Sequence, residues 1–459
     1  MNKSADAAEP KADFQAWWML GLLLALYIIS FIDRSMIIML VDPIKTDLGL
    51  TDFEMSILLG PAFGVFYAIF GLPLGWAADK YSRRMVIFLG VFVWCLATTL
   101  TAFATTFALM FLARMFVAIG EASLTPSAYS MISDRFPRKR LTTALSFYSM
   151  GPKAGKSIAY IVGGLVIGLT SVYGAQTLPF VGRMEVWQFV FLAVGLPGIL
   201  VACLLFTVPE PPRRSPPKLR ADGTTENVWA FLLERKRLFI PLLLGFCLVC
   251  VPSVALQTWI PTYMDRQFHW EPMQYGPAIG IISGLAAFSL PLKGLAVDWL
   301  YARGMRDAAL RFYTWLLGLC IPATVIGFAT ANPYVLLVCY GFIQVIALPY
   351  LLYASSILQL LVPSEMRGRL TAILLFSVTL AGSMLGPTSV AALQDFVFTG
   401  QEALGLSLAV VSLICIATGW ILLRISLGRV TPLLLDLDPI SGAADQDQSA
   451  PPSKKQAPA

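Results

Sequence analysis

The sequence predicts an all-α membrane protein in which twelve transmembrane helices form two pseudo-symmetric six-helix bundles. Of its 459 residues, 57% are hydrophobic and only 13% are charged. A soluble domain carries about 25% charged residues, so this composition excludes a water-soluble globular protein. The chain also contains twelve apolar stretches long enough to cross a bilayer, which takes about 20 residues of helix. One long polar break, residues 209–237, divides these stretches into six and six.

The twelve predicted spans follow one another with short polar connections. They cover residues 16–41, 53–78, 85–104, 107–133, 141–170, 186–208, 238–264, 274–297, 308–330, 333–361, 368–394 and 402–427. The chain is accordingly divided into a tail at 1–15, a first bundle at 16–208, a central loop at 209–237, a second bundle at 238–428 and a tail at 429–459. The last segment is too polar to bury a core, and we expect it to be disordered.

The basic residues predict the orientation of the spans. Loops and tails on one side hold 25 Lys and Arg, whereas the other side holds only Lys45, Arg183 and Arg266. Cytoplasmic loops carry the excess of Lys and Arg, so both termini and the central loop are predicted to be cytoplasmic. The N-terminus lacks a basic start and a small-residue cleavage site, which predicts that the first span is retained. The short outer loops favour a bacterial inner membrane.

Composition and motifs argue against several other classes of protein. The seven cysteines all lie in apolar stretches, where we expect buried small hydrophobes rather than disulfides, and His269 is the only histidine, so no metal site is expected. No HExxH, GxSxG or nucleotide-binding loop is present, which argues against an enzyme and leaves no ATP site. The net charge of +6 is spread over short loops, so no nucleic-acid partner is expected. A channel fits the two pseudo-symmetric halves less well than a transporter does, and a transporter-like receptor would be expected to carry an added soluble domain. The sequence therefore favours a monomeric, gradient-driven transporter that needs no cofactor.

An internal repeat relates the two halves. Three motifs occur in the same order in both halves, offset by roughly 220 to 235 residues. The pairs are LPLGWAADKYSRR at 72–84 with LPLKGLAVDWLYARG at 290–304, FPRKRLTTAL at 136–145 with VPSEMRGRLTAIL at 362–374, and SMGP at 149–152 with SMLGP at 383–387. Two duplicated six-helix halves are the architecture of many secondary transporters.

Several motifs carry a resemblance to known transporters. GWAADKYSRR at 75–84 resembles the signature of the major facilitator superfamily, although it has Trp76 and has Ser82 in place of a glycine. The Gly-Pro-x-x-Gly motif of residues 151–155 resembles a signature of the drug-antiporter branch of this superfamily. Two segments resemble motifs of the Spinster family: Phe-Ile-Asp-Arg at 31–34, and Arg114 followed by Gly-Glu-Ala-Ser at 120–123. This resemblance implies export of lysolipids and sphingosine phosphate. The Asp-Arg pair is also similar to that of organic-anion symporters in the same superfamily.

Seven charged residues lie more than three residues inside the ends of the predicted spans. They are Asp33, Arg34, Arg114, Glu121, Lys153, Lys156 and Lys293. Each costs about 2.5–3.5 kcal/mol at the membrane centre, so they should pair with one another or face a water-filled cavity. Arg114 and Glu121 are seven residues apart, which places them on one helix face about 10 Å apart along the axis. The distance is too long for a direct pair.

The resemblance implies that spans 1, 4, 7 and 10 line a central cavity, where Asp33 and Arg34 would face Arg114 and Glu121. We expect Asp33 to pair with Arg114 and Glu121 to exchange a proton, switched by movement of Arg34. The alternative is a static ion-pair lock between two helices. These four residues are the predicted proton-coupling set.

Candidate substrate contacts include Glu121 and Arg34 together with the lysines of the fifth span. Lys153 and Lys156 could hold a phosphate or carboxylate, or they could instead snorkel or pair with a carboxylate such as Glu121. Lys293 lies near a span end, where snorkelling is expected. Further candidates on the seventh and tenth spans are Gln257, Tyr350 and Tyr353. The small residues Gly151, Gly155, Ala159 and Gly163 are expected to pack against a neighbouring helix.

The cytoplasmic motif predicts a gate. Asp79, Arg83 and Arg84 could clamp spans 2 and 11 together and hold the inner side shut in the outward-facing state. Gly75 spaces this motif, and Asp298 and Arg303 belong to its copy in the second half. The alternative is that these charges only set the topology.

Together these features predict a proton-coupled secondary active transporter that works by alternating access. The predicted activity is export of amphipathic lipids, such as lysophospholipids or sphingosine phosphate, or of hydrophobic drugs. Uptake of small organic anions such as sugar acids together with protons is the alternative.

Overall fold

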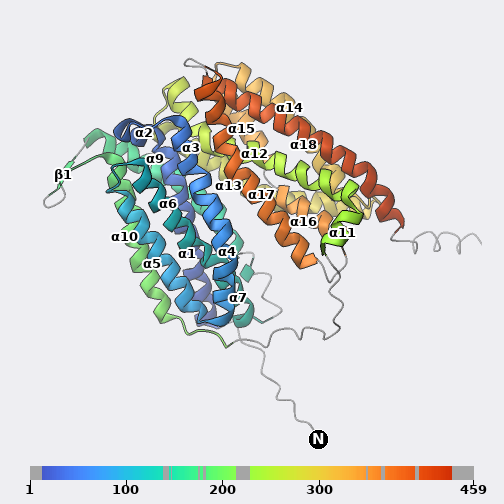
Figure 1. The fold of residues 1–459 in the computed structure, drawn as a ribbon, viewed down its shortest axis with the longest axis horizontal. Coiled ribbons are helices and arrows are strands. Elements are labelled where there is room, and N and C mark those ends of the chain that lie inside the picture. Colours follow the sequence, from blue (N-terminus) through green and yellow to red (C-terminus); the bar gives the residue numbers. More distant parts are fainter. Residues whose placement is uncertain are drawn as a thin grey trace, which may run out of the picture.

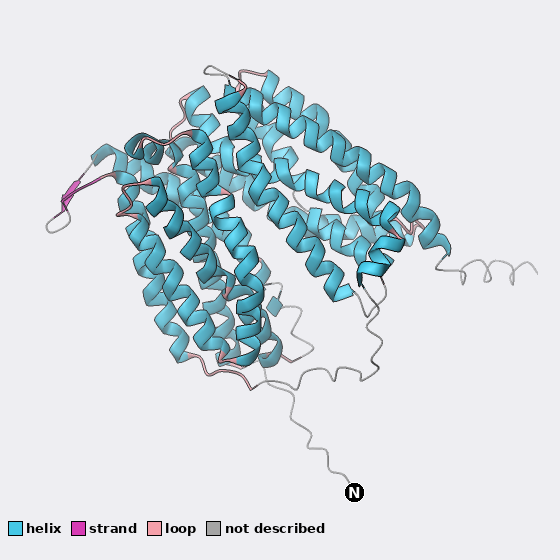
Figure 2. Ribbon diagram, in the orientation of Figure 1, coloured by secondary structure: helices cyan, strands magenta, loops and turns pink. Residues whose placement is uncertain are grey.

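The computed structural model is almost entirely helical, with two helical bundles side by side (Figures 1 and 2). It describes residues 13–137, 144–145, 147–173, 176–178, 182–212, 228–347, 350–362, 367–398 and 403–436. Among these, ten helical segments are long and apolar enough to cross a membrane, and a further shorter apolar helix covers Pro333–Ala347. The predicted all-helical membrane architecture is confirmed.

The first bundle contains the elements up to the central loop. They are α1 (Phe14–Met39), α2 (Val41–Leu48), α3 (Asp52–Leu59), α4 (Pro61–Lys80), α5 (Arg83–Thr101), α6 (Phe107–Ala122), α7 (Leu124–Arg135), α9 (Gly151–Tyr173), α10 (Val186–Cys203) and a 3-10 turn (Leu204–Thr207). A short antiparallel hairpin, β1 (Gln176–Leu178) and β2 (Gly182–Met184), connects α9 to α10 on the outer side and is absent from the sequence-based prediction.

The second bundle follows a short helix, α11 (Val228–Glu234). Its elements are α12 (Lys236–Phe268), α13 (Pro272–Ala302), α14 (Ala308–Ala329), α15 (Pro333–Ala347), α16 (Tyr350–Leu361), α17 (Arg367–Phe396) and α18 (Ala403–Asp436). The last helix therefore continues beyond position 428, where the sequence-based division ended the bundle. The extension packs on the bundle, since Val430 is fully buried and Thr431 hydrogen-bonds to Asp307.

Two of the predicted spans are each broken into two helices at a residue that the structure describes. The span at 53–78 breaks at Gly60, which separates α3 from α4 and lies against the backbone of Ser383 in α17. The span at 107–133 breaks at Ser123, between α6 and α7. Pro126 follows this break and has no N–H to donate to the carbonyl of Ala122, so a continuous α-helix would lack a hydrogen bond there.

The sequence repeat reappears in the packing of the helices. Gly151 of α9 lies against Tyr27 in α1, where a side chain would approach Tyr27 Cδ1 to 2.8 Å. Its repeat counterpart, Gly386 of α17, lies against Val251 and Val254 of α12. Each motif thus packs on the first helix of its own bundle. Gly155, one turn further along α9, lies against the Ile28 backbone, which agrees with the close packing predicted for the small residues of the fifth span.

The two bundles meet chiefly at two places, and α1 also contacts α12. The α9–α13 pair is packed through Gly164 and Gly276, and the Ser157 hydroxyl donates a hydrogen bond to the Gly280 carbonyl at 2.9 Å. At the second place, α17 contacts α3 and the outer end of α4. Near the inner ends of α4 and α13, by contrast, nothing lies within 4 Å of the Cβ positions of Gly71 and Gly294.

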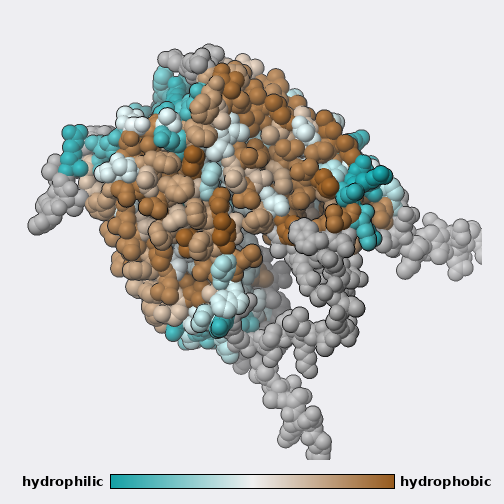
Figure 3. All heavy atoms as spheres, in the orientation of Figure 1, coloured by the Kyte–Doolittle hydropathy of each residue, from teal (hydrophilic) through white to brown (hydrophobic). Residues whose placement is uncertain are grey.

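The bundles therefore converge on the predicted outer side and separate on the predicted cytoplasmic side (Figure 1). With the orientation predicted from the basic residues, this is an inward-facing arrangement. In the view of Figure 3, apolar residues cover the flanks of both bundles, and hydrophilic residues gather toward their ends. That distribution matches a protein embedded in a bilayer.

The tight α9–α13 contact yields a testable prediction. In Gly164→Val, the Cβ position lies 2.4 Å from the Pro272 carbonyl oxygen, so the helices must separate. Overpacking of this kind costs about 1–3 kcal/mol, and we expect a lower melting temperature in detergent. Gly21→Val is the matched control, because nothing lies within 4 Å of that Cβ position. Equal melting temperatures for the two variants would contradict this packing.

Candidate functional site

Four charged residues form a central charge cluster within the first bundle: Asp33 and Arg34 on α1, and Arg114 and Glu121 on α6. All except Arg34 are at most 2% exposed. The Arg34 Nε donates a hydrogen bond to Glu121 Oε2 at 2.6 Å, and the two side chains form an ion pair. The Glu121 side chain is 1% exposed and that of Arg34 is 24% exposed, so the arginine forms the accessible side of the pair.

The partner of Asp33 differs from the sequence-based expectation. Asp33 Oδ2 accepts a hydrogen bond from the Thr98 hydroxyl of α5 at 2.9 Å. The structure shows no ion pair between Asp33 and Arg114, so the expected direct pairing is absent from this conformation. Arg114 is nevertheless the cation with the strongest electrostatic attraction to Asp33. The reason is local, because Thr98 supplies the hydrogen-bond donor that the prediction assigned to Arg114.

Unused hydrogen-bonding capacity remains inside the central charge cluster. Asp33 Oδ1, Glu121 Oε1, and the Nε and Nη1 atoms of Arg114 are buried without a hydrogen-bond partner. Buried polar groups are usually satisfied, so four such atoms in one cluster are unusual. The cluster therefore holds two acids and two arginines whose hydrogen-bonding capacity is not fully used in this conformation.

Aromatic rings surround the Arg34 guanidinium. Its Cζ lies 4.2 Å from the centre of the Phe63 ring, 4.7 Å from that of Phe31 and 5.0 Å from that of Tyr67. Cations are stabilised over such rings by electrostatic attraction to the π face. These rings therefore stabilise the Arg34 guanidinium in addition to the Glu121 carboxylate.

A second group of cations lies between the bundles. Lys156 of α9 hydrogen-bonds to the Gln257 side chain of α12, and the Tyr160 hydroxyl donates to the Gln257 carbonyl at 3.2 Å. The ammonium group of Lys153 is close enough to repel those of Lys156 and Lys293. Among the residues that the structure describes, none of these three lysines has a carboxylate partner, which excludes the pairing of Lys156 with Glu121 in this conformation.

Lys293 does not snorkel to the membrane surface as expected. It is 8% exposed, and its ammonium group donates to the Ser289 hydroxyl at 2.9 Å and to the Val345 carbonyl. Carbonyl and hydroxyl acceptors from α13 and α15 thus replace the water that snorkelling would supply.

The two predicted tyrosine contacts differ in their surroundings. Tyr350 accepts a hydrogen bond from the Cys250 thiol at 3.2 Å, at the junction of α12 and α16. Tyr353 is 1% exposed and stacks on Tyr313, with ring centres 4.6 Å apart. Its position in the core of the second bundle is that of a packing residue. Gln257, in contrast, lies at the interface of the two bundles.

The cytoplasmic motif forms contacts within the first bundle. Arg83 is 1% exposed and binds Asp134 and Ser130 of α7, and its backbone N–H donates to Glu210 Oε1 at 2.8 Å. Arg84 donates to the Val208 carbonyl at 3.1 Å. In the described part of the chain, neither arginine bridges to α17, as expected when the inner side is open.

Other parts of the predicted gate are less constrained. The Cβ position of Gly75 lies 4.0 Å from Pro126 of α7, which is ordinary contact. Arg303 is exposed and stacks over the Trp299 ring at 3.5 Å. The side chains of Asp79 and Asp298 lie outside the described residues.

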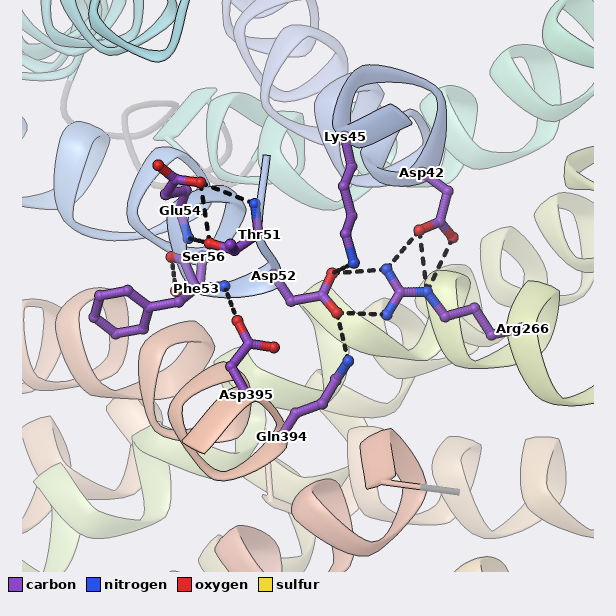
Figure 4. Close-up of polar contacts among 10 residues, drawn as sticks. All are labelled: Asp42, Lys45, Thr51, Asp52, Phe53, Glu54, Ser56, Arg266, Gln394 and Asp395. Atoms are coloured by element: carbon purple, nitrogen blue, oxygen red, sulfur yellow. Dashed lines mark hydrogen bonds and ion pairs between the residues drawn. The ribbon is translucent and has the colours of Figure 1, made fainter. Parts of the chain in front are cut away.

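Sequence reasoning missed an outer polar cluster that joins the bundles (Figure 4). Its members are Asp42, Lys45, Asp52, Arg266 and Gln394. The Arg266 guanidinium of α12 donates from both terminal nitrogens to Asp52 at 2.7 Å each, and its Nε donates to Asp42 at 3.0 Å. One signal was available in the sequence, because Arg266 is one of only three basic residues predicted on the outer side.

Comparisons with known proteins agree with this architecture. The model of the Major Facilitator Superfamily matches residues 23–387. An MFS-type efflux pump of Mycolicibacterium smegmatis is 25% identical, with 88% of this chain and 90% of the pump aligned. A D-galactonate transporter of Escherichia coli O6:H1 is also 25% identical, with 68% of this chain and 74% of that protein aligned.

A solved structure shares the fold. It is described as a bacterial homolog of the human lysosomal transporter Spinster in an inward-facing, unoccupied conformation. It superimposes with a TM-score of 0.75 at 24% identity and covers 92% of this chain and 99% of its own.

The inner contacts of Glu210 lead to a pH prediction. Burial acts to raise the pKa of the Glu210 carboxyl, but hydrogen bonds from Ser82 and Arg83 outweigh it and hold the pKa below its usual value. A lowered pKa in the folded state adds stability above the ordinary Glu range, near about 4.3, and this stability is lost as the pH falls through the folded pKa.

We therefore expect Glu210→Gln to lower the melting temperature near pH 7 by about 2–4 °C and to reduce the loss of stability in acid. Scanning fluorimetry between neutral and acidic pH measures both effects. Ser82→Ala removes one of the hydrogen-bond donors to Glu210. Its melting temperature should lie between those of Glu210→Gln and the unmodified chain. A variant curve parallel to that of the unmodified chain at every pH would exclude this role of Glu210.

Proposed function

Given that the chain belongs to the Major Facilitator Superfamily, we propose that it couples proton movement to the export of amphipathic lipids or hydrophobic drugs by alternating access. The family consists of multi-pass membrane transporters, which are not enzymes and use no cofactor. The proposed substrates are lysophospholipid-like or sphingosine-phosphate-like molecules, and the proposed location is a bacterial inner membrane with both termini cytoplasmic. The observation that carries the coupling proposal is the buried Arg34–Glu121 pair.

The proposed switch exchanges the partners of Arg34. In the inward-facing arrangement, Arg34 binds Glu121, a carboxylate that is almost fully removed from water. A proton taken up by Glu121 neutralises it and removes most of the attraction of the ion pair. The guanidinium can then remain over the rings of Phe31 and Phe63 after it releases Glu121.

Arg114 and Asp33, the other two members of the central charge cluster, can compensate the charges of Glu121 and Arg34 during this exchange. Arg114 has two buried nitrogens without hydrogen-bond partners, and Asp33 has one such oxygen. Either group can compensate when Arg34 and Glu121 separate, so the cluster need not leave a bare charge in the membrane interior. A static lock would be expected to satisfy these atoms, and their orphaned state supports the switch.

The lysines of α9 support a substrate with an anionic group. Lys153 and Lys156 face the second bundle without a carboxylate partner among the described residues, and Lys156 contacts Gln257. A phosphate bound between them would neutralise their mutual repulsion. The aromatic surroundings of Arg34 supply apolar contacts for the remainder of an amphipathic molecule.

Uptake of small organic anions is the second candidate function. The same unpaired lysines are suited to a carboxylate, and an E. coli relative that aligns over 68% of this chain is named as a D-galactonate transporter. The efflux pump of M. smegmatis, which aligns over 88%, supports export instead. Transport assays in inverted membrane vesicles, with a lysolipid and a hexuronate as competing substrates, would separate the two functions.

The proposed coupling role is tested by Glu121→Gln. The glutamine preserves the size of the side chain but cannot carry a proton on and off, so we expect pH-gradient-driven transport to fall at least about 100-fold. Substrate exchange without a gradient should persist. The measurement is substrate flux in vesicles with and without an imposed pH gradient.

Glu234→Gln is the control for this experiment, since it alters an exposed acid at the inner end of α11. Asp33→Asn reports on the second acid and should reduce gradient-driven transport less, because Asp33 retains its Thr98 contact. Full gradient-driven flux in Glu121→Gln would sink the assignment of Glu121.

Substrate recognition is tested by Lys153→Ala and Lys156→Ala. Loss of a charge-assisted contact costs about 1.5–3 kcal/mol, which corresponds to a rise in KM for an anionic substrate of roughly tenfold or more. An uncharged analogue of the same substrate should show little change. Lys236→Ala, at the exposed start of α12, is the matched control. An equal effect on charged and uncharged substrates would show a structural role instead.

A further inference from the structure

The outer side of the molecule is closed by a polar cluster with partners from both bundles. Arg266 comes from α12 of the second bundle, whereas Asp42 and Asp52 come from α2 and α3 of the first. Gln394 of α17 adds a hydrogen bond to Asp52 from the second bundle. A guanidinium with both terminal nitrogens on one carboxylate is a strong and directional contact. Figure 4 shows these contacts, and Figure 1 shows that α2 and α3 lie on the side where the bundles converge.

A second contact, between α3–α4 and α17, closes the same side next to the outer polar cluster. The backbone N–H of Phe53, in α3, donates to Asp395 of α17 at 2.8 Å. Below it, the Cβ position of Gly60 lies 2.2 Å from the Ser383 carbonyl oxygen, and that of Gly64 lies 2.3 Å from Ser383 Cβ. Only glycine at these positions permits the observed distance between the helices. We call the contact of Gly60 and Gly64 with Ser383 the glycine seam.

The Arg266–Asp42 side of the outer polar cluster is open to water. The Arg266 side chain is 24% exposed and that of Asp42 is 27% exposed, so water can replace their contacts. Asp52 is 2% exposed but also pairs with Lys45 of its own bundle at 2.9 Å, and it would keep this partner after separation. An ion pair with such access to water is worth less than a buried one and can be broken repeatedly.

We propose that Arg266, with its carboxylate partners Asp42 and Asp52, is the outer gate of the transporter and that the glycine seam is the packing surface on which this gate closes. Opening toward the outside requires Arg266 to release both carboxylates and α17 to leave Gly60 and Gly64. The outer contacts therefore stabilise the inward-facing state against the outward-facing state. This inference concerns the positions of the bundles and does not depend on the proposed substrate or on proton coupling.

The experiment measures the distance between the bundles in the full-length protein. Spin labels at Thr46→Cys and Ala331→Cys report on the outer ends of the two bundles, and both positions are exposed. Labels at Pro212→Cys and Ala302→Cys report on the inner ends. Pulsed dipolar spectroscopy in lipid nanodiscs gives both distance distributions, and chains with one introduced cysteine correct for labelling of native cysteines.

Arg266→Gln and Gly64→Ala are the test variants. In each, we expect the ratio of outer-open to outer-closed molecules to rise about tenfold, with longer outer distances and shorter inner distances. Arg266→Lys keeps the positive charge but cannot donate from two nitrogens to one carboxylate. Its ratio of outer-open to outer-closed molecules should lie between those of Arg266→Gln and the unmodified chain. Asp42→Asn removes one partner only and serves as a milder variant if Arg266→Gln does not fold.

Two controls match these changes. Arg183→Gln removes another outer arginine, whose side chain is 76% exposed. Gly71→Ala alters the same helix as Gly64 at a position with nothing within 4 Å. Both should keep the distances of the unmodified chain. Unchanged distances in both Arg266→Gln and Asp42→Asn would overturn the polar gate, and unchanged distances in Gly64→Ala would overturn the role of the seam.

Discussion

The central constraint on this structure is that a charge inside the membrane needs a counter-charge, hydrogen bonds or water. The Arg34–Glu121 pair meets this constraint within the first bundle, between α1 and α6. Other elements are arranged around that pair, because the glycines of α9 allow close packing against α1 while α5 places Thr98 beside Asp33. The cluster could not be held at this depth without these neighbours, since each unpaired charge would cost about 2.5–3.5 kcal/mol.

The transmembrane architecture was predictable from the sequence because hydrophobic length and basic-residue asymmetry act over whole segments. The repeat predicted two related halves, and it is visible as the paired contacts of Gly151 with α1 and Gly386 with α12. Breaks inside spans were harder to predict. The break at Gly60 depends on the approach of α17, a contact 323 residues distant in sequence that no local pattern encodes.

The candidate site was predicted by residue type more successfully than by partner. The four charges of the central charge cluster do gather, but Asp33 binds Thr98, an uncharged residue whose importance depends on the packing of α5. Lys293 appeared free to reach the surface, and it is held by Ser289 and a carbonyl of α15 instead. The partners of Arg266 lie 214 and 224 residues away in the sequence, so only the fold reveals them.

The location of all four central charges in one bundle has an electrical consequence. Two carboxylates and two guanidinium groups sum to zero, so with Glu121 ionised this cluster contributes no net charge movement when the bundle rocks across the membrane field. A proton on Glu121 would give the cluster a charge of +1 in the same movement. Moving one charge through the full field is worth about 2.3 kcal/mol per 100 mV. The membrane voltage would then act on this cluster in one of the two half-cycles only.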